Sequence, residues 1–197
     1  MQLSEHELDI ISSTRAKVSG DKTLTGENLF LVWGYPTAII LMLEFIALWL
    51  WQSAWCYWLW VLIPIIGSPT MLYFLHKDHA RTHHTTLNES IILQMWIFIG
   101  CTCFIGGLTT GIVGFFDRFF LTLLGLLCSM GCFMTGVILR FRPKVLCGIV
   151  AALLSFIPLF LQGDLWLWQL PVTALVIMIA LIIPGYLFRQ FVKKHAV

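Results

Sequence analysis

Hydrophobic residues are concentrated in six long stretches that alternate with short polar segments. Each stretch holds about 20 residues or more, which at a rise of 1.5 Å per residue lets a helix cross roughly 30 Å of hydrocarbon. The predicted spans are residues 29–51, 54–75, 88–115, 118–140, 143–161 and 165–188. The pattern predicts an all-α, polytopic membrane protein whose six transmembrane helices form three hairpins. This transmembrane domain, 29–188, follows a polar leader, 1–28, and precedes a short basic tail, 189–197.

The basic residues lie almost all on one side of these spans, which sets the predicted orientation. Eleven of the 12 Lys and Arg fall in the leader, in the segments after the second and fourth spans, and in the tail; only Arg118 lies on the opposite side. Because cytoplasmic loops carry the excess of basic residues, both termini are predicted to be cytoplasmic. The positions of the tryptophans support this orientation, because indole rings prefer the headgroup layer of a membrane. Seven of them flank the outer loops: Trp49, Trp51, Trp55, Trp58, Trp60, Trp166 and Trp168.

The polar leader carries a helix signal. Ser4 and Glu7 form a capping-box pair, and Gly20 can end the helix. We therefore predict an amphipathic helix over about residues 5–19. It could lie on the membrane surface, dock against a cytoplasmic protein partner, or remain a solvated cap. The acidic start of the leader also differs from the basic, then apolar, beginning of a cleaved signal peptide.

Composition narrows the classes of function. With 59% hydrophobic and 11% charged residues, the chain is committed mostly to spans, and no separate soluble domain is expected. The net charge of +2, with no basic patch interleaved with aromatics, excludes nucleic acid as an expected partner. The sequence contains no G-x-S-x-G elbow, no H-E-x-x-H motif and no phosphate-binding glycine loop. The six cysteines are interpreted as buried packing residues.

Small residues inside the spans predict which helices pack closely. Gly107-x3-Gly111 on the third span and Cys128-x3-Cys132-x3-Gly136 on the fourth each place small side chains on one face. Such faces let helix backbones approach each other in lipid. We therefore expect the third and fourth spans to form a tight hairpin. Prolines in four of the spans predict kinks: Pro36, Pro64, Pro69, Pro158, Pro171 and Pro184.

Glu44 is the one carboxylate well inside a predicted span. A charge at that depth is costly, so the side chain is expected to be protonated, to be paired inside the bundle, or to face a wet cavity. The interiors of the other spans contain no Lys or Arg, so Gln169, Thr109 and Thr135 are the candidate hydrogen-bond partners. Two interpretations stay open: a proton or cation relay, and a neutral structural acid.

A histidine cluster lies at the predicted cytoplasmic surface: His76, His79, His83 and His84. It is similar to one histidine box of membrane di-iron enzymes, which need several boxes, whereas this chain has one. On a continuous helix His76 and His83 are about 10 Å apart along the axis. One zinc ion needs each ligand nitrogen within roughly 2.1 Å, so it could take at most an adjacent pair. A metal site, a pH-responsive patch and a solvated interfacial loop are the alternatives.

Three stretches together indicate a family: Val32-Trp33-Gly34-Tyr35-Pro36, TGVILRFRPKVLCGI at 135–149 and ALIIPGYLFR at 180–189. Over about residues 4–190 the chain resembles a family of uncharacterised bacterial multi-pass inner-membrane proteins. The resemblance implies a six-span protein of the bacterial inner membrane with a short helical leader. The family has no assigned activity, so the resemblance implies no catalytic residue and no cofactor. Its members carry Lys and Arg where this chain has its histidine cluster, which weakens the metal interpretation.

The sequence leads us to expect a non-enzymatic membrane component that senses, anchors or assists a partner through residues 5–19 and the basic turns. The alternative is a small transporter or channel subunit that uses Glu44. A third hypothesis is a metal-dependent membrane enzyme at the histidine cluster. The expected partners are the lipid bilayer and, besides a cytoplasmic protein, a second copy of the chain in a homo-oligomer.

Overall fold

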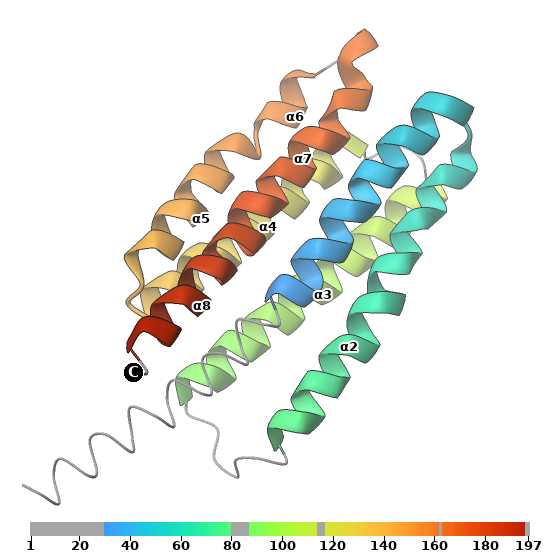
Figure 1. Ribbon diagram of the computed structural model, residues 1–197. Coiled ribbons are helices and arrows are strands. Elements are labelled where there is room, and N and C mark those ends of the chain that lie inside the picture. The colour runs from blue at the N-terminus through green and yellow to red at the C-terminus, as the bar shows by residue number, and fades with distance from the viewer. Residues whose placement is uncertain (1–29, 80–86, 114–116, 162, 196–197) are drawn as a thin grey trace, which may run out of the picture.

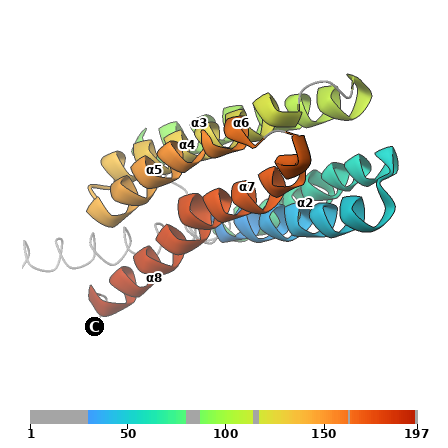
Figure 2. The ribbon, with the colours of Figure 1, turned by 90° about the horizontal axis from the view of Figure 1, so that it is seen from above.

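The computed structural model describes residues 30–79, 87–113, 117–161 and 163–195, and these residues form helices and no strand. Figure 1 shows the helices running side by side as an elongated bundle, and Figure 2 shows the same bundle from above. The predicted all-α architecture is therefore confirmed for the described residues. The helix predicted for 5–19 lies outside them.

The helices follow the predicted spans closely. The first runs over Phe30–Trp51. The next rod joins the 3-10 helix η1 (Ala54–Val61) to α2 (Leu62–His79), and the long helices α3 (Leu87–Val113) and α4 (Asp117–Ile138) follow. The remaining elements are α5 (Arg142–Leu154), α6 (Ile157–Phe160), η2 (Gly163–Trp168), α7 (Gln169–Ile177), the π-helical segment η3 (Met178–Ile182) and α8 (Ile183–His195).

Five helical stretches among the described residues are long and apolar enough to cross a membrane: Phe30–Trp51, Ser90–Thr109, Phe119–Ile138, Arg142–Phe160 and Gly163–Phe191. The predicted second span, 54–75, contains a shorter apolar helix, Trp58–Tyr73. Length and composition therefore define a helical bundle of the membrane-protein type. The six-span count and the orientation stay predictions.

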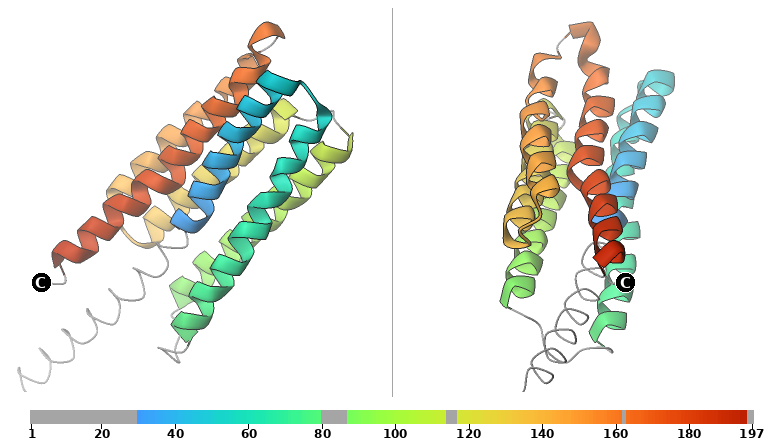
Figure 3. Two further views of the ribbon diagram at one scale, coloured as in Figure 1. Left: turned by 45° about the vertical axis from the view of Figure 1, so that its right-hand side comes forward. Right: turned by 60° about the vertical axis from the view of Figure 1, so that its left-hand side comes forward.

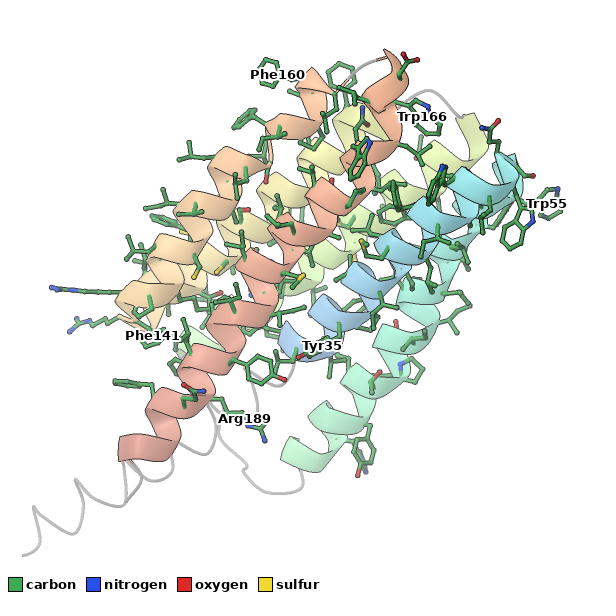
Figure 4. All side chains as sticks on the ribbon, turned by 45° about the horizontal axis from the view of Figure 1, so that its top comes forward. Tyr35, Trp55, Phe141, Phe160, Trp166 and Arg189 are labelled. Atoms are coloured by element: carbon green, nitrogen blue, oxygen red, sulfur yellow. The ribbon has the colours of Figure 1, made fainter. Side chains whose placement is uncertain are left out.

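The two ends of the bundle carry different side chains. Figure 4 places Trp55, Phe160 and Trp166 at one end and Phe141 and Arg189 at the other. We call these the tryptophan end and the arginine end. Trp55 is 79% exposed and Trp166 is 40% exposed, as expected of indole rings that lie in a headgroup layer.

The core lies between the first helix, α4, α5 and the rod from α7 to α8. Leu41, Cys132, Ala151 and Ile177, one from each of these four, are fully buried. By contrast, 6% of the apolar stretch Ser90–Thr109 in α3 is buried, against 56% of the corresponding stretch of α4. Helix α3 therefore lies at the edge of the bundle, where the left view of Figure 3 shows it.

The closest helix pair is α4 with α5. A β-carbon added at Gly136 would lie 2.8 Å from the backbone nitrogen of Val145. A β-carbon added at Gly148 would lie 2.7 Å from the backbone nitrogen of Phe133. The two backbones thus touch where only glycine fits. The small-residue face predicted on α4 does mediate close packing, but at Gly136 the neighbour is α5 and not α3.

Helix α3 packs on α4 through aromatic rings. A β-carbon at Gly131 of α4 would lie 2.9 Å from the ring of Trp96, and one at Gly106 of α3 would lie 2.7 Å from the ring of Phe120. Trp96 donates a hydrogen bond from Nε1 to Oγ1 of Thr135 at 3.1 Å. Because rings fill the space, the expected hairpin of the third and fourth spans is present but is held by aromatic side chains rather than by touching backbones.

A tight turn at the arginine end joins α4 to α5. Arg140 adopts a left-handed conformation with φ of 53°, which is common just beyond a helix C-terminus. The N–H of Phe141 donates to the carbonyl oxygen of Gly136 at 2.9 Å, and that of Arg140 donates to Val137 at 3.1 Å. These bonds satisfy carbonyls that the end of α4 leaves open. Pro143 lies in the first turn of α5, where its missing N–H is not needed.

Two of the prolines coincide with interruptions of regular helix geometry. Helix α5 ends at Leu154 and α6 begins at Ile157, with Pro158 in the first turn of α6. Further along, the helix widens to π geometry over η3, which directly precedes α8 and Pro184. Because a proline cannot donate to the carbonyl one turn earlier, such local adjustment is typical of membrane helices. The predicted kinks therefore have a structural counterpart on these two rods.

Candidate functional site: a buried carboxyl in the helical bundle

Glu44 lies on the inward face of the Phe30–Trp51 helix and is 1% exposed. Leu41 and Leu48, one turn before and one turn after it, are also buried, whereas Leu43 is 49% exposed. The carboxyl group is therefore enclosed by the bundle and does not face the surrounding membrane.

Helix α7 brings an amide to the height of Glu44. The rings of Phe45 and Trp168 are 5.6 Å apart, so Glu44, just before Phe45, and Gln169, just after Trp168, lie at about the same level of the bundle. Gln169 is 2% exposed. Its Nε2 donates a hydrogen bond to the carbonyl oxygen of Leu161 at 2.6 Å, which holds the amide inside the bundle near the start of α7.

Three more buried hydroxyls lie in the same half of the bundle, up to about 10 Å further along the rod of α7 from Gln169: Thr173 from α7, Thr122 from α4 and Ser155 from the junction of α5 and α6. They are 1%, 6% and 1% exposed, respectively. A β-carbon at Gly125 would lie 2.6 Å from Oγ of Ser155 and 3.3 Å from the side chain of Val176, so α4 meets both neighbours at one height. Thr122 and Thr173 each lie one turn from this contact, toward the tryptophan end.

We call these five side chains the buried polar layer: Glu44, Thr122, Ser155, Gln169 and Thr173. They come from four rods of the bundle. Glu44 lies about 10 Å along its helix from Trp51, and Thr122 lies about 8 Å from the start of α4. Oγ1 of Thr122 is buried with no hydrogen-bond partner among the described residues. The layer thus groups a carboxyl, an amide and three hydroxyls in the half of the bundle toward the tryptophan end, in surroundings that are otherwise apolar.

The chemistry open to this layer is the exchange of a proton or a cation. A carboxyl at such depth is tolerated when it is protonated or paired, and hydroxyl and amide groups can hydrogen-bond to either form. The layer contains no second ionisable group, so Glu44 is the residue in it that can change charge.

Gln169 is the favoured partner among the three that the sequence offered for Glu44, because it lies at the same height. Thr135 instead accepts the hydrogen bond from Trp96 at 3.1 Å, on the interface between α3 and α4. Thr109 donates to a carbonyl of its own helix at 2.8 Å, on the exposed side of α3.

A second charged side chain, Lys144, is also 1% exposed, and the sequence did not predict this. Its ammonium group lies 3.9 Å from the ring centroid of Phe30 and 6.0 Å from that of Phe188, where the negative faces of the rings attract a cation. The predicted orientation places the basic segment after the fourth span, with Arg140, Arg142 and Lys144, at the cytoplasmic surface. Those two arginines are exposed, but Lys144 points into the bundle.

The inward direction of Lys144 follows from its register on α5. Lys144, Gly148 and Ala151 form the buried face of this helix, at the spacing of one helical stripe. The two small residues at this spacing were the available signal in the sequence. Phe30, which lies under the ammonium group, is 14 residues before Glu44 and therefore about 21 Å away along the first helix. Lys144 and the buried polar layer thus lie toward opposite ends of the bundle.

The histidine cluster is only partly covered by the structure. Helix α2 ends at His79, and His76 is exposed one turn earlier. His83 and His84 lie outside the described residues. Within the part of the chain that the structure describes, no group of three or more His, Cys, Asp or Glu side chains could hold a metal ion. The metal site at the four histidines stays a prediction.

The cysteines are free thiols. The packing interpretation fits Cys56, Cys128 and Cys132, which are buried, but it is wrong for Cys101, which is exposed on α3. Cys103 and Cys147 are half-buried.

Comparison with protein-family models, with curated proteins and with solved structures found no match to this chain. The fold and composition of the described residues define the class: an all-helical protein with several helices able to span a membrane. The family resemblance of the sequence stays a prediction.

Proposed function

We propose that this chain is a small membrane protein that moves protons or small cations, and that Glu44 is the group that binds and releases them. The observation that carries the proposal is a carboxyl that is 1% exposed within a layer of polar side chains from four rods. Ionisable residues at membrane depth are rare and commonly mark ion or proton pathways. A hydrogen-bonding role alone could be filled by glutamine without the cost of a buried ionisable group.

Interrupted helices beside the layer support the same proposal. Ser155 follows the last residue of α5, and η2 passes into α7 at Gln169. The break between α6 and η2 leaves the carbonyl oxygen of Leu161 to accept the Gln169 amide at 2.6 Å. Broken helices of this kind border the binding sites of many transporters, because their free backbone groups can coordinate ions.

The proposal includes a location, the inner membrane of a bacterium, with both termini in the cytoplasm. The arginine end then faces the cytoplasm and the tryptophan end faces outward. Arg140, Arg142 and Arg189 are exposed at the arginine end, in agreement with the excess of basic residues in cytoplasmic segments.

The direct test is ion flux into liposomes that contain the purified full-length chain and a pH-sensitive dye. The wild-type protein should carry protons or a small cation across the bilayer, and Glu44→Gln should reduce the flux to that of empty liposomes. Asp164→Asn is the matched control, because Asp164 is an exposed carboxylate at the tryptophan end. Its flux should equal that of the wild type. Undiminished flux in Glu44→Gln, or no flux in the wild type for any ion tried, would contradict the proposal.

A second candidate function is a non-enzymatic component that senses, anchors or assists a cytoplasmic partner. The exposed arginines at the arginine end favour it, together with the helix predicted over residues 5–19. In this case substitution of Glu7, Arg15 and Lys17 should abolish the capture of a specific protein from membrane extracts. Capture that survives these substitutions counts against this candidate.

A further inference from the structure

Helix α3 presents one face to the bundle and leaves the other exposed. On the packed face, Trp96 and Ile99 both lie against Gly131 of α4, and Gly106 lies against the ring of Phe120. In the apolar stretch Ser90–Thr109, Ile99 is the one buried residue, nine residues are half-buried and ten are exposed. About half of the positions of this membrane-length helix are therefore open to whatever surrounds the monomer.

The exposed face has a central line of residues spaced by seven: Gln94, Cys101 and Leu108. Ile97 and Phe104 flank this line and are 48% and 46% exposed. The spacing of 94, 97, 101, 104 and 108 is the alternation of three and four residues that left-handed helix pairs use at their contact. A surface that meets only lipid has no use for an amide and a small thiol on its central line, whereas a helix–helix contact uses both.

Gln94 is the residue that sets this face apart. It is exposed and lies about 8 Å along the helix from the midpoint of the stretch Ser90–Thr109, within the roughly 15 Å half-thickness of a hydrocarbon core. Lipid tails offer no hydrogen bond to an amide. The amide dipole carries partial positive charge on its N–H groups and partial negative charge on its oxygen, so a second Gln94 turned by a two-fold rotation is its electrostatic complement.

We propose that two copies of this chain form a parallel dimer through the exposed faces of α3, with the two Gln94 amides bonded to each other across the axis. A two-fold axis along the membrane normal brings each residue of the central line next to its own copy and closes the assembly. Cys101 then meets the partner's Cys101, at the helix spacing of about 8–10 Å. The dimer places the buried polar layer of each copy away from the contact, so it is independent of the proposed flux through Glu44.

Cysteine cross-linking tests the contact directly. The full-length wild-type chain in liposomes is oxidised with copper phenanthroline and separated without reductant. We expect a cross-linked dimer in the wild type and in Cys147→Ser, which changes a half-buried cysteine on α5. The dimer should be lost in Cys101→Ser. A dimer band that persists in Cys101→Ser, or no dimer band in the wild type, would overturn the proposal.

Fluorescence energy transfer between labelled copies, measured over a series of protein-to-lipid ratios, tests the role of the amide. Gln94→Leu should weaken the association constant by about 3- to 30-fold, the range expected for one interhelical side-chain hydrogen bond in a bilayer. Gln190→Leu, the same substitution at an exposed position of α8, should leave it unchanged. A monomeric wild type at every ratio, which would mean that lipid alone covers α3, contradicts the dimer. So does an unchanged association constant in Gln94→Leu.

Discussion

Replacement of Gly148 by alanine tests whether the contact between α4 and α5 holds the bundle together. The added β-carbon would lie 2.7 Å from the backbone nitrogen of Phe133 and 2.8 Å from its Cα. Both are backbone atoms, so no rotamer change can relieve the clash. Helices α4 and α5 must therefore move apart, which also disturbs the packing of the buried α5 face that carries Lys144 and Ala151.

The size of the effect follows from these distances. Ordinary contact of a β-carbon begins at 3.4 Å, so α4 and α5 must move apart by about 0.7 Å locally. Overpacking of a well-packed contact typically costs about 1–3 kcal/mol. The higher helix propensity of alanine offsets up to ~1 kcal/mol of that cost. We expect Gly148→Ala to lower the free energy of unfolding by about 1–2 kcal/mol.

Reversible unfolding in mixed micelles, titrated with a denaturing detergent and followed by circular dichroism, measures this difference. Gly100→Ala is the matched control, because a β-carbon at Gly100 would meet nothing within 4 Å. That variant should be as stable as the wild type or slightly more stable. If Gly148→Ala unfolds like the wild type, or if both variants lose equal stability, the contact between α4 and α5 is not as the structure describes it.

Substitutions at Arg140 and Lys144, each with a comparison variant, test the arginine end by the same titration. Arg140→Gly should raise the free energy of unfolding by about 0.5–1 kcal/mol, because glycine adopts the positive φ of this turn without strain; Arg142→Gly, inside the first turn of α5, should lower it. Lys144→Met keeps the buried volume but removes the ammonium group from the Phe30 ring, so it should lower the free energy of unfolding by about 0.5–2 kcal/mol, whereas Lys144→Ala also leaves a cavity and should lower it by about 2–5 kcal/mol. A Lys144→Met variant as unstable as Lys144→Ala would show that the charge over the Phe30 ring, rather than packing, stabilises this corner.

The helices could be predicted from the sequence because a long apolar run in lipid satisfies its own backbone hydrogen bonds by forming a helix. Its backbone groups must bond within the run, so each predicted span becomes a helix. Single residues also marked the ends of helices. Pro143 is the first residue of the predicted fifth span, and it lies in the first turn of α5, where proline is common. The 3-10 start at Ala54–Val61 was not predictable, since aromatic and apolar residues there suit either kind of helix.

The pairing of the helices could not be predicted in the same way. Periodicity shows which residues share a face but not which helix covers that face. The face that includes Gly136 therefore predicted close packing without naming α5. Lys144 was assigned to the membrane surface by its charge, whereas its place on the Gly148 stripe turns it inward. Glu44 was singled out as the one carboxylate well inside a predicted span, but the buried amide and hydroxyls in the same half of the bundle come from helices distant in sequence, and only the fold brings them together.

The central claim is that Glu44, inside the bundle, takes up and releases a proton. Infrared difference spectroscopy of the protein in lipid bilayers after a pH jump measures this most directly. The account predicts paired bands of opposite sign, one from the protonated and one from the ionised carboxyl, that are present in the wild type and in Asp164→Asn and absent in Glu44→Gln. Identical difference spectra for the wild type and Glu44→Gln would show that Glu44 exchanges no proton, and would contradict the account.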